Sequence, residues 1–402
     1  MPPRRTLLLR LLLPLGALLV ADQLVQHTAL ADGRFLGHWV IPYDPPLFTD
    51  WHHAAALEIA QLADGDAALR EKSIFDPELG WCPRPGQDLG LYVHDWAGCR
   101  IQLGELAREK TPGVRRAVAV GCSFTQGAEV QGNETWSAVL DARRADLEVA
   151  NLGVAGYGND QALLRFRRDG ARLAPDEVWL GFMPSATLRV TTHYPPVYGH
   201  WASVMTFKPL FTLGAGDELV LVPSPARDFA EYHRLLSDQH AFVAALGETD
   251  RWVQRTPAAF APRGTSWTHW FASTRLFVTW QEAGGRDTAP HLRDPQDDTY
   301  RLTRALILQL ARESAAAGAR FRLVVLPSRA DLREARAAGR CWNGLLADLA
   351  REGVESIDTT GALLAAGASD DDACWMPMEH YSPRANEIVA TALEGALASA
   401  PR

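Results

Sequence analysis

The sequence predicts an α/β fold in which helices cover both faces of a parallel sheet. In two stretches of the chain, short apolar runs alternate with longer segments of helical periodicity, which is the pattern of strand–helix–strand units. The chain ends in a segment whose apolar residues recur at helical spacing, so a helix is expected to close the fold. Its 402 residues are 47% hydrophobic, which is enough to bury a substantial core.

Three strands and two helices are predicted in the first stretch. In chain order they are strand 117–121, helix 134–143, strand 148–152, helix 159–173 and strand 177–182. Asn133 precedes the first helix and is expected to cap it, because its side chain can accept a backbone N–H. Residues 211–222 read as a hairpin that turns at Gly214-Ala215-Gly216-Asp217. Residues 225–295 interrupt the alternation with an irregular, partly helical and tryptophan-rich segment.

The alternation then resumes and runs to the end of the chain. The predicted elements are helix 300–317, strand 320–326, helix 342–352, strand 355–358 and helix 383–397. Ser382 at the N-cap and Pro383 at the first helical position mark the start of the last helix. The resulting division is an N-terminal extension at 32–112, an α/β domain at 113–196 and 297–402, and an insertion at 197–296.

Residues 1–31 are predicted to be a signal peptide or an N-terminal membrane anchor. Arg4, Arg5 and Arg10 accompany a leucine-rich stretch, and residues 11–21 are apolar without a break, which suits a signal-peptide core. If Arg10 reaches back to the membrane surface, residues 7–21 form a short uncleaved anchor instead. Both alternatives predict a periplasmic or secreted protein, while a buried N-terminal helix of a soluble protein is the third.

Charge and cysteine content exclude other classes of function. The net charge is −8 and no basic block follows the first ten residues, so nucleic acid is not an expected partner. Two local disulfides, Cys82–Cys99 and Cys341–Cys374, are possible and would leave Cys122 free. No Cys-x-x-Cys motif or His/Cys cluster occurs, and the adjacent pair His52-His53 has no evident third ligand. We therefore predict neither a metal site nor a cofactor.

Ser123 is the candidate nucleophile. It follows the predicted strand 117–121 in the sequence Gly121-Cys122-Ser123, and a helical segment comes after it. A small residue before the serine lets the backbone turn tightly and leaves the hydroxyl accessible. The alternative is an ordinary serine that caps a loop, because a strand followed by Gly-x-Ser is a weak pattern on its own.

Two further segments carry residue types that a serine nucleophile needs. Residues 151–158 follow the next predicted strand, and their glycines let a backbone N–H point at an oxyanion. His380 precedes the last helix, where an imidazole can reach the strand ends and act as a base. The alternatives are a connection that needs glycine for steric reasons alone and a structural histidine. In an open α/β sheet, sites lie at the carboxyl ends of the strands.

Together these blocks resemble the SGNH/GDSL hydrolase superfamily, in particular its bacterial members with an N-terminal anchor. The resemblance covers residues 74–190 and 320–397. The matching residues are Asp76-Pro77-Glu78-Leu79-Gly80-Trp81, Gly121-Cys122-Ser123-Phe124-Thr125, Gly127, Val130, Thr135-Trp136, Asn151, Gly153, Gly156-Tyr157-Gly158, Asp160-Gln161, His380, Ser382 and Ala385-Asn386. The resemblance implies a three-layer α/β/α sandwich that hydrolyses or transfers ester-linked acyl groups. It also implies Ser123 as nucleophile, His380 as base, and the N–H groups of Ser123 and Gly156 as oxyanion donors.

Three positions depart from the pattern of this superfamily. Cys122 stands where an aspartate is usual. The third block, Met183-Pro184-Ser185-Ala186-Thr187, offers no asparagine near Ala186 to donate to the oxyanion. The aspartate expected two or three residues before the histidine falls on Pro377 or Met378. Glu379, the run 370–372 or a backbone carbonyl could orient His380 instead, and we predict Asp372 for this role.

Three functions are compatible with these residues. The first is an extracytoplasmic serine esterase or deacylase that forms an acyl-enzyme on an ester-bearing small molecule, lipid or glycan. The second is an O-acyltransferase that acts on an exported polysaccharide or a cell-envelope glycan, which membrane attachment and a tryptophan-rich insertion would suit. The third is a catalytically degenerate binding protein that kept the fold, which the missing asparagine and aspartate would explain.

Overall fold

The computed structural model describes residues 4–30, 33–36, 38–41, 75–195, 207–255, 267–283 and 287–399. Contacts divide the chain into two compact units. The N-terminal unit comprises Met1–Gly65, Pro196–Val204 and Ala226–Arg286, and the sheet unit comprises Asp66–Pro195, Met205–Pro225 and Asp287–Arg402. His52-His53, which we did not assign to a metal site, lies outside the described residues.

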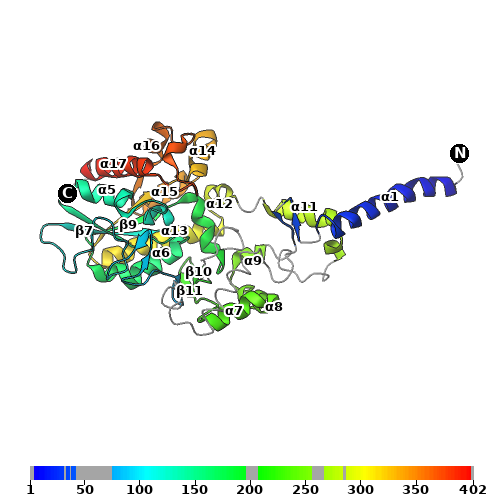
Figure 1. Ribbon diagram of the computed structural model, residues 1–402, viewed down its shortest axis with the longest axis horizontal. Coiled ribbons are helices and arrows are strands. Elements are labelled where there is room, and N and C mark those ends of the chain that lie inside the picture. The colour runs from blue at the N-terminus through cyan, green and yellow to red at the C-terminus, as the bar shows by residue number, and fades with distance from the viewer. Residues whose placement is uncertain are drawn as a thin grey trace. The chain divides into compact units, whose positions relative to one another are not determined.

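A five-stranded parallel sheet is the centre of the sheet unit (Figure 1). Its strands are β7 (Arg115–Gly121), β8 (Leu147–Asn151), β9 (Glu177–Phe182), β12 (Arg320–Val325) and β13 (Glu355–Asp358). Their order is β13-β12-β9-β7-β8, and every neighbouring pair is parallel. In chain order the sheet therefore reads 2-1-3-4-5 from the β8 edge, which is the flavodoxin-like doubly wound arrangement.

Helices cover both faces of this sheet, because the strand residues alternate in the direction of their side chains. On β7, Val118 and Val120 belong to the core shared with α6 (Asn159–Arg165) and α13 (Asp298–Ala316). Ala117 and Ala119 belong to the core shared with α5 (Trp136–Arg143) and α17 (Pro383–Ser399). The two pairs of helices lie on opposite sides of the strands in Figure 1. The predicted α/β fold, a three-layer α/β/α sandwich with a central parallel sheet, is thus confirmed.

The predicted helices of the sheet unit are present in the predicted order with shifts at their ends. The helices and turns of the unit are α4 (Ser123–Gln126), η1 (Gly132–Glu134), α5 (Trp136–Arg143), α6 (Asn159–Arg165), η2 (Phe166–Gly170), η3 (Ala171–Leu173), η4 (Pro184–Thr191), α12 (Ala289–Arg293), α13 (Asp298–Ala316), α14 (Arg329–Ala338), α15 (Asn343–Arg351), α16 (Thr360–Ala365), η8 (Asp372–Cys374) and α17 (Pro383–Ser399). Of these, α12, α14, α16 and several short turns were not predicted. The expected cap Asn133 was wrong: it lies in the turn η1, and the Thr135 side chain caps α5 by accepting from Ala138 N–H.

In the described part of this unit, three two-stranded hairpins accompany the sheet. They pair β3 (Phe75–Asp76) with β4 (Gly80–Trp81), β5 (Asp88–Leu89) with β6 (Tyr92–Val93), and β10 (Leu210–Leu213) with β11 (Leu219–Val222). The last is the predicted hairpin around residues 214–217, which is confirmed. It groups with the sheet although it lies within the segment predicted to be an insertion.

The N-terminal unit contains the first helix and a group of short helices. Its elements are α1 (Arg4–His27), β1 (Arg34–Phe35), β2 (His38–Trp39), α7 (Phe229–Ser237), α8 (Gln239–Leu246), α9 (Arg251–Arg255), η6 (Trp267–Trp270) and α11 (Ala272–Ala283). Within the described part of the chain, we find no helix with the length and apolar character needed to cross a membrane.

All five cysteines are buried free thiols, so the two disulfides considered from their spacing do not form. The Cys82 thiol lies instead against two arginines: Arg165 donates to its Sγ at 2.7 Å and Arg168 at 3.2 Å. Burial raises the pKa of Cys82 and, to a larger extent, that of Cys99. These thiols are therefore neutral packing groups of the core.

Candidate active site

Ser123 is the first residue of the short helix α4, directly after strand β7. The turn is tight because three glycines let other groups approach closely. A Cβ on Gly121, whose φ is +152°, would lie 2.3 Å from Thr125 Oγ1, and one on Gly153 would lie 2.4 Å from Gln126 N. A Cβ on Gly181 would also collide with Thr125. Only glycine fits at these positions, so the sequence around Ser123 enforces this turn.

This turn lies where the strand order of the sheet reverses. The second strand, β8, pairs on one side of β7, and the third strand, β9, pairs on the other. In doubly wound sheets the crevice at such a reversal, beyond the carboxyl ends of the strands, is the usual ligand site. The loops that follow β7, β8 and β9 carry Ser123, Gly156 and Met183, respectively, so the fold brings these three segments to one edge.

The loop that carries Gly156 is braced on both sides. Gly156 has φ +82°, a conformation that favours glycine. The carbonyl of Ala155 accepts from Trp81 Nε1 at 2.8 Å, and the carbonyl of Tyr157 accepts from Arg189 at 3.1 Å. The Tyr157 hydroxyl in turn donates to the Trp81 carbonyl at 2.6 Å. The segment 76–81 therefore holds the glycine loop in place through Trp81. This is a structural role for the first of the sequence blocks that match the superfamily.

His380 lies on a bent loop before α17, beside Phe124, the residue that follows Ser123. Its ring centroid is 5.5 Å from that of Phe124. The loop is closed by a bridge between Trp375 and Tyr381 and by the Met376 N–H, which donates to the His380 carbonyl at 2.8 Å. The Tyr381 hydroxyl donates to the Pro327 carbonyl at 2.7 Å, which ties the loop to the end of β12. His380 thus lies at the same edge as Ser123.

Glu129 is the carboxylate that contacts this histidine, and sequence reasoning missed it. Its Oε2 lies 2.7 Å from His380 Nδ1. The same carboxylate accepts the Met378 N–H at 3.0 and 3.2 Å. Glu129 has φ +68°, a left-handed conformation that costs a non-glycine residue about 1–2 kcal/mol. A strained conformation of this kind persists where surrounding contacts impose it. Here it places the Glu129 carboxylate against the His380 imidazole.

Arg100 supplies most of those contacts. Its buried guanidinium donates to the carbonyls of Gln126, Gly127 and Val130, which surround Glu129 in sequence. The guanidinium also lies 4.9 Å from the ring centroid of Tyr92, a cation–π distance. The Tyr92 hydroxyl accepts the Glu129 N–H at 3.0 Å. Burial lowers the pKa of Arg100 to about 10, so the group remains charged at neutral pH.

Asp372, which we expected to orient His380, lies elsewhere. Its side chain is 89% exposed and pairs with Arg329 at 2.5 Å. Asp370 pairs with Arg336 and Asp371 with Arg384 at 2.9 Å, so the whole acidic run is engaged by arginines. The expectation was wrong because it looked for the acid near His380 in sequence. The acid that contacts His380 is 251 residues away from it.

The third block offers no side-chain donor for an oxyanion. The Ala186 N–H donates to the Met183 carbonyl at 3.0 Å. The Ser185 hydroxyl bonds to Asp331 at 2.9 Å and to Ser328 at 3.1 Å. Met183, the first residue after β9, places its Sδ 3.9 Å from Cys122 Sγ. A thioether is no hydrogen-bond donor, so the Met183 side chain offers no donor beside Cys122.

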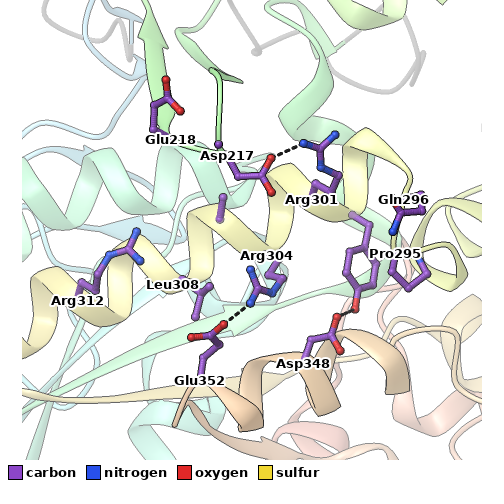
Figure 2. A pocket seen from close by; sticks show the side chains of 13 residues that line it. Asp217, Glu218, Pro295, Gln296, Arg301, Arg304, Leu308, Arg312, Asp348 and Glu352 are labelled. Atoms are coloured by element: carbon purple, nitrogen blue, oxygen red, sulfur yellow. Dashed lines mark hydrogen bonds and ion pairs between the residues drawn. The ribbon is translucent and has the colours of Figure 1, made fainter.

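No metal centre accompanies these groups: within the described ranges, His, Cys, Asp and Glu side chains nowhere gather in threes as possible ligands. A pocket of about 750 Å³ lies along α13, and neither Ser123 nor His380 is among the residues that line it (Figure 2). Two of its arginines are paired with carboxylates of the same lining: Arg301 with Asp217, and Arg304 with Glu352 at 2.5 Å. None of the predicted site residues lines it.

By its strand order and its two helical layers, the sheet unit is a doubly wound α/β/α sandwich. Similar solved structures include a member of the lipolytic protein G-D-S-L family from Veillonella parvula (11% identity, 71% of this chain and 100% of that chain, TM-score 0.36). A GDSL-like lipase from Bacteroides thetaiotaomicron (12%, 74% and 93%, TM-score 0.35) and the acetyl xylan esterase AlAXEase (11%, 70% and 99%, TM-score 0.35) are also similar. No family model and no curated protein matches the chain.

The site at this edge of the sheet combines a strand-end hydroxyl, a histidine whose Nδ1 is held by a carboxylate, and a braced glycine loop. Among the described residues the Ser123 hydroxyl makes no hydrogen bond, to His380 or to any other group.

Proposed function

We propose that the protein is a serine hydrolase that cleaves ester-linked acyl groups through Ser123, His380 and Glu129. The contact between Glu129 Oε2 and His380 Nδ1, at 2.7 Å, carries this proposal. A carboxylate on Nδ1 fixes the tautomer in which Nε2 is free to accept a proton, and it stabilises the imidazolium that then forms. A purely structural histidine beside Ser123 would not require a strained glutamate to reach it across the fold.

In this mechanism Ser123 Oγ attacks the ester carbonyl while His380 Nε2 takes the hydroxyl proton. The proton then passes to the leaving alcohol, and the acyl group stays on Ser123. Water deprotonated by the same nitrogen attacks the acyl-enzyme and releases the acid. The backbone N–H groups of Ser123 and Gly156 would bind the oxyanion. As the first residue of α4, Ser123 has no intrahelical partner for its N–H.

The site has two oxyanion donors where the resemblance implies three. A missing donor typically reduces kcat by about 10²–10³. We therefore expect turnover well below that of a site with all three donors, and esters with good leaving groups to be the most sensitive probes. The glycine loop is held by Trp81 and Arg189 on both sides of Gly156, so the remaining backbone donor is preorganised.

The test is hydrolysis of short p-nitrophenyl esters by the purified chain, together with labelling by a fluorophosphonate. We expect measurable hydrolysis and one covalent adduct on Ser123, and neither in the variant Ser123→Ala. Ser185→Ala is a matched control, since this serine also follows a strand but bonds to Asp331 and Ser328. A folded protein that neither hydrolyses esters nor takes up the label would instead be a binding protein of the same fold.

We propose an extracytoplasmic location for this activity, on the strength of residues 11–21, which form an unbroken apolar run after three arginines. An alkaline phosphatase fusion to residue 402 tests it: the fusion is active only outside the cytoplasm. An inactive but full-length fusion would contradict the location without bearing on the esterase assay.

A further inference from the structure

Four large aromatic side chains of the N-terminal unit face outward. Trp267 is 72% exposed, Trp270 62%, Phe277 58% and Trp280 73%. They belong to η6 and α11, and the rings of Phe277 and Trp280 lie 6.1 Å apart on one face of α11. Large aromatics normally supply much of the apolar area that a fold buries. We call these four side chains the aromatic ledge.

The ledge is fixed to the C-terminal turns of α1, which belongs to the same unit. The two carboxylate oxygens of Asp22 accept the Ala272 and Ser273 N–H groups, both at 2.8 Å. Gln23 Nε2 donates to the Trp270 carbonyl at 2.8 Å. The opposite face of α11 packs on Leu30 and Val40 through Ala272. In Figure 1, α11 lies beside the end of α1 from which these bonds come.

Between Leu12 and Ala21, α1 carries only apolar residues, so this part of the helix is apolar on all sides. Exposed aliphatic residues follow one another around the helix at positions 12, 13, 15, 18, 19 and 20. A helix that is hydrophobic all round requires an apolar environment. In sequence, Arg4, Arg5 and Arg10 precede or interrupt this run, and Asp22 is the first acidic residue after it. The apolar run therefore ends at the residue that holds the ledge.

We propose that the aromatic ledge rests in the headgroup region of a phospholipid bilayer, with the apolar side chains of α1 in contact with the acyl chains. Tryptophan concentrates at membrane interfaces because its indole is apolar apart from one N–H. The position of the ledge at the end of the apolar run puts it at that depth. The arginines at the other end of the run suit anionic headgroups. This inference is independent of the proposed esterase chemistry.

Depth-dependent quenching of tryptophan fluorescence tests the proposal. The full chain is reconstituted in vesicles of phosphatidylcholine and phosphatidylglycerol, with or without lipids brominated near the headgroup. The variant Trp267→Phe/Trp270→Phe/Trp280→Phe keeps the ledge apolar and aromatic. The difference in emission between the unsubstituted chain and this variant therefore reports the three ledge indoles. We expect brominated lipid to quench that difference emission at least twofold. Trp96→Phe, a partly buried tryptophan of the sheet unit, is the matched control, and its difference emission should not respond.

Each other outcome contradicts the proposal. Ledge indoles that respond to iodide in water but not to brominated lipid would be free in solvent. Indoles shielded from both would pack against protein, either a second copy of the chain or another of its segments. Replacement of all four ledge residues by serine should in addition lower recovery of the chain with vesicles in flotation at least tenfold under conditions where the phenylalanine variant floats. Equal flotation of the two variants would also overturn the inference.

Discussion

Glu129→Gln is the substitution that best tests the proposed site. It keeps the size of the side chain and one acceptor oxygen, but it removes the charge 2.7 Å from His380 Nδ1. The charge matters only when the imidazole becomes imidazolium, which is in the transition state. Two unit charges about 4 Å apart interact by about 4 kcal/mol at an effective dielectric constant of about 20. That corresponds to a loss of about 10³-fold in kcat.

Steady-state hydrolysis of a p-nitrophenyl ester measures this effect, and KM should change little because the contact strengthens after the substrate is bound. Two neighbouring acids provide matched controls. Glu379 is adjacent to His380 in sequence but lies 3.9 Å from Arg329, and Asp372 is paired with the same arginine. Glu379→Gln and Asp372→Asn should each change kcat less than about threefold, as expected of exposed ion pairs.

Two results would refute the reasoning. The first is a Glu129→Gln protein that retains full activity while Ser123→Ala is inactive, since the carboxylate would then play no part. The second is a loss of activity in Asp372→Asn with none in Glu129→Gln. Thermal unfolding of all variants separates these outcomes from misfolding, because removal of one charge at a partly buried position should leave the protein folded.

Three other predictions follow from the described contacts. Arg100→Met should lower the free energy of unfolding by about 3 kcal/mol or more in urea titrations, because three buried carbonyls lose their donor; an unchanged midpoint would contradict this. Met183→Asn should raise kcat tenfold or more, since its Nδ2 would occupy the position of Sδ, 3.9 Å from Cys122 Sγ; no gain would show that the donor is misplaced. Burial lowers the pKa of His94 and of His193 from 6.5 to about 4, so the unfolded chain takes up their protons at a higher pH than the folded chain does. As the pH falls from 6.5 to 4, the free energy of unfolding should therefore decrease by about 1.4 kcal/mol per pH unit for each histidine. His94→Gln should reduce that slope in urea titrations at several pH values.

The strands and the longest helices were predictable because their signals are local. Strand β9 has the predicted bounds 177–182, and all six of its residues are buried, as a central parallel strand requires. Helix α14 was missed because its sequence, RADLREARAA, carries a single large apolar residue, Leu332, and a strong polar face. Its start is set by Ser328, whose side chain accepts the Asp331 N–H, a capping signal that becomes informative only once a helix is suspected.

The role of Glu129 could not be read from the sequence, for two physical reasons. The contact joins positions 251 residues apart, so no local pattern reports it. The glutamate also has a positive φ, a conformation that sequence propensity assigns to glycine or asparagine. One signal was present without being interpretable: Arg100 ends the buried run Ala97-Gly98-Cys99-Arg100, and a buried guanidinium needs several acceptors. Its acceptors are the carbonyls around Glu129.

The loop from Trp375 to Tyr381 explains why Glu129, instead of an aspartate close to His380 in sequence, contacts the histidine. The resemblance places an aspartate two or three residues before His380, and Met378 occupies one of those positions. Its backbone N–H donates to both carboxylate oxygens of Glu129, at 3.0 and 3.2 Å. The loop thus binds the acid through its backbone instead of carrying it as a side chain, and the same glutamate contacts both the histidine and the loop that presents it. A deletion that shortens this loop should therefore lower the activity that depends on His380 even with Glu129 intact. The Glu129 carboxylate would lose the Met378 N–H, the donor that fixes its orientation.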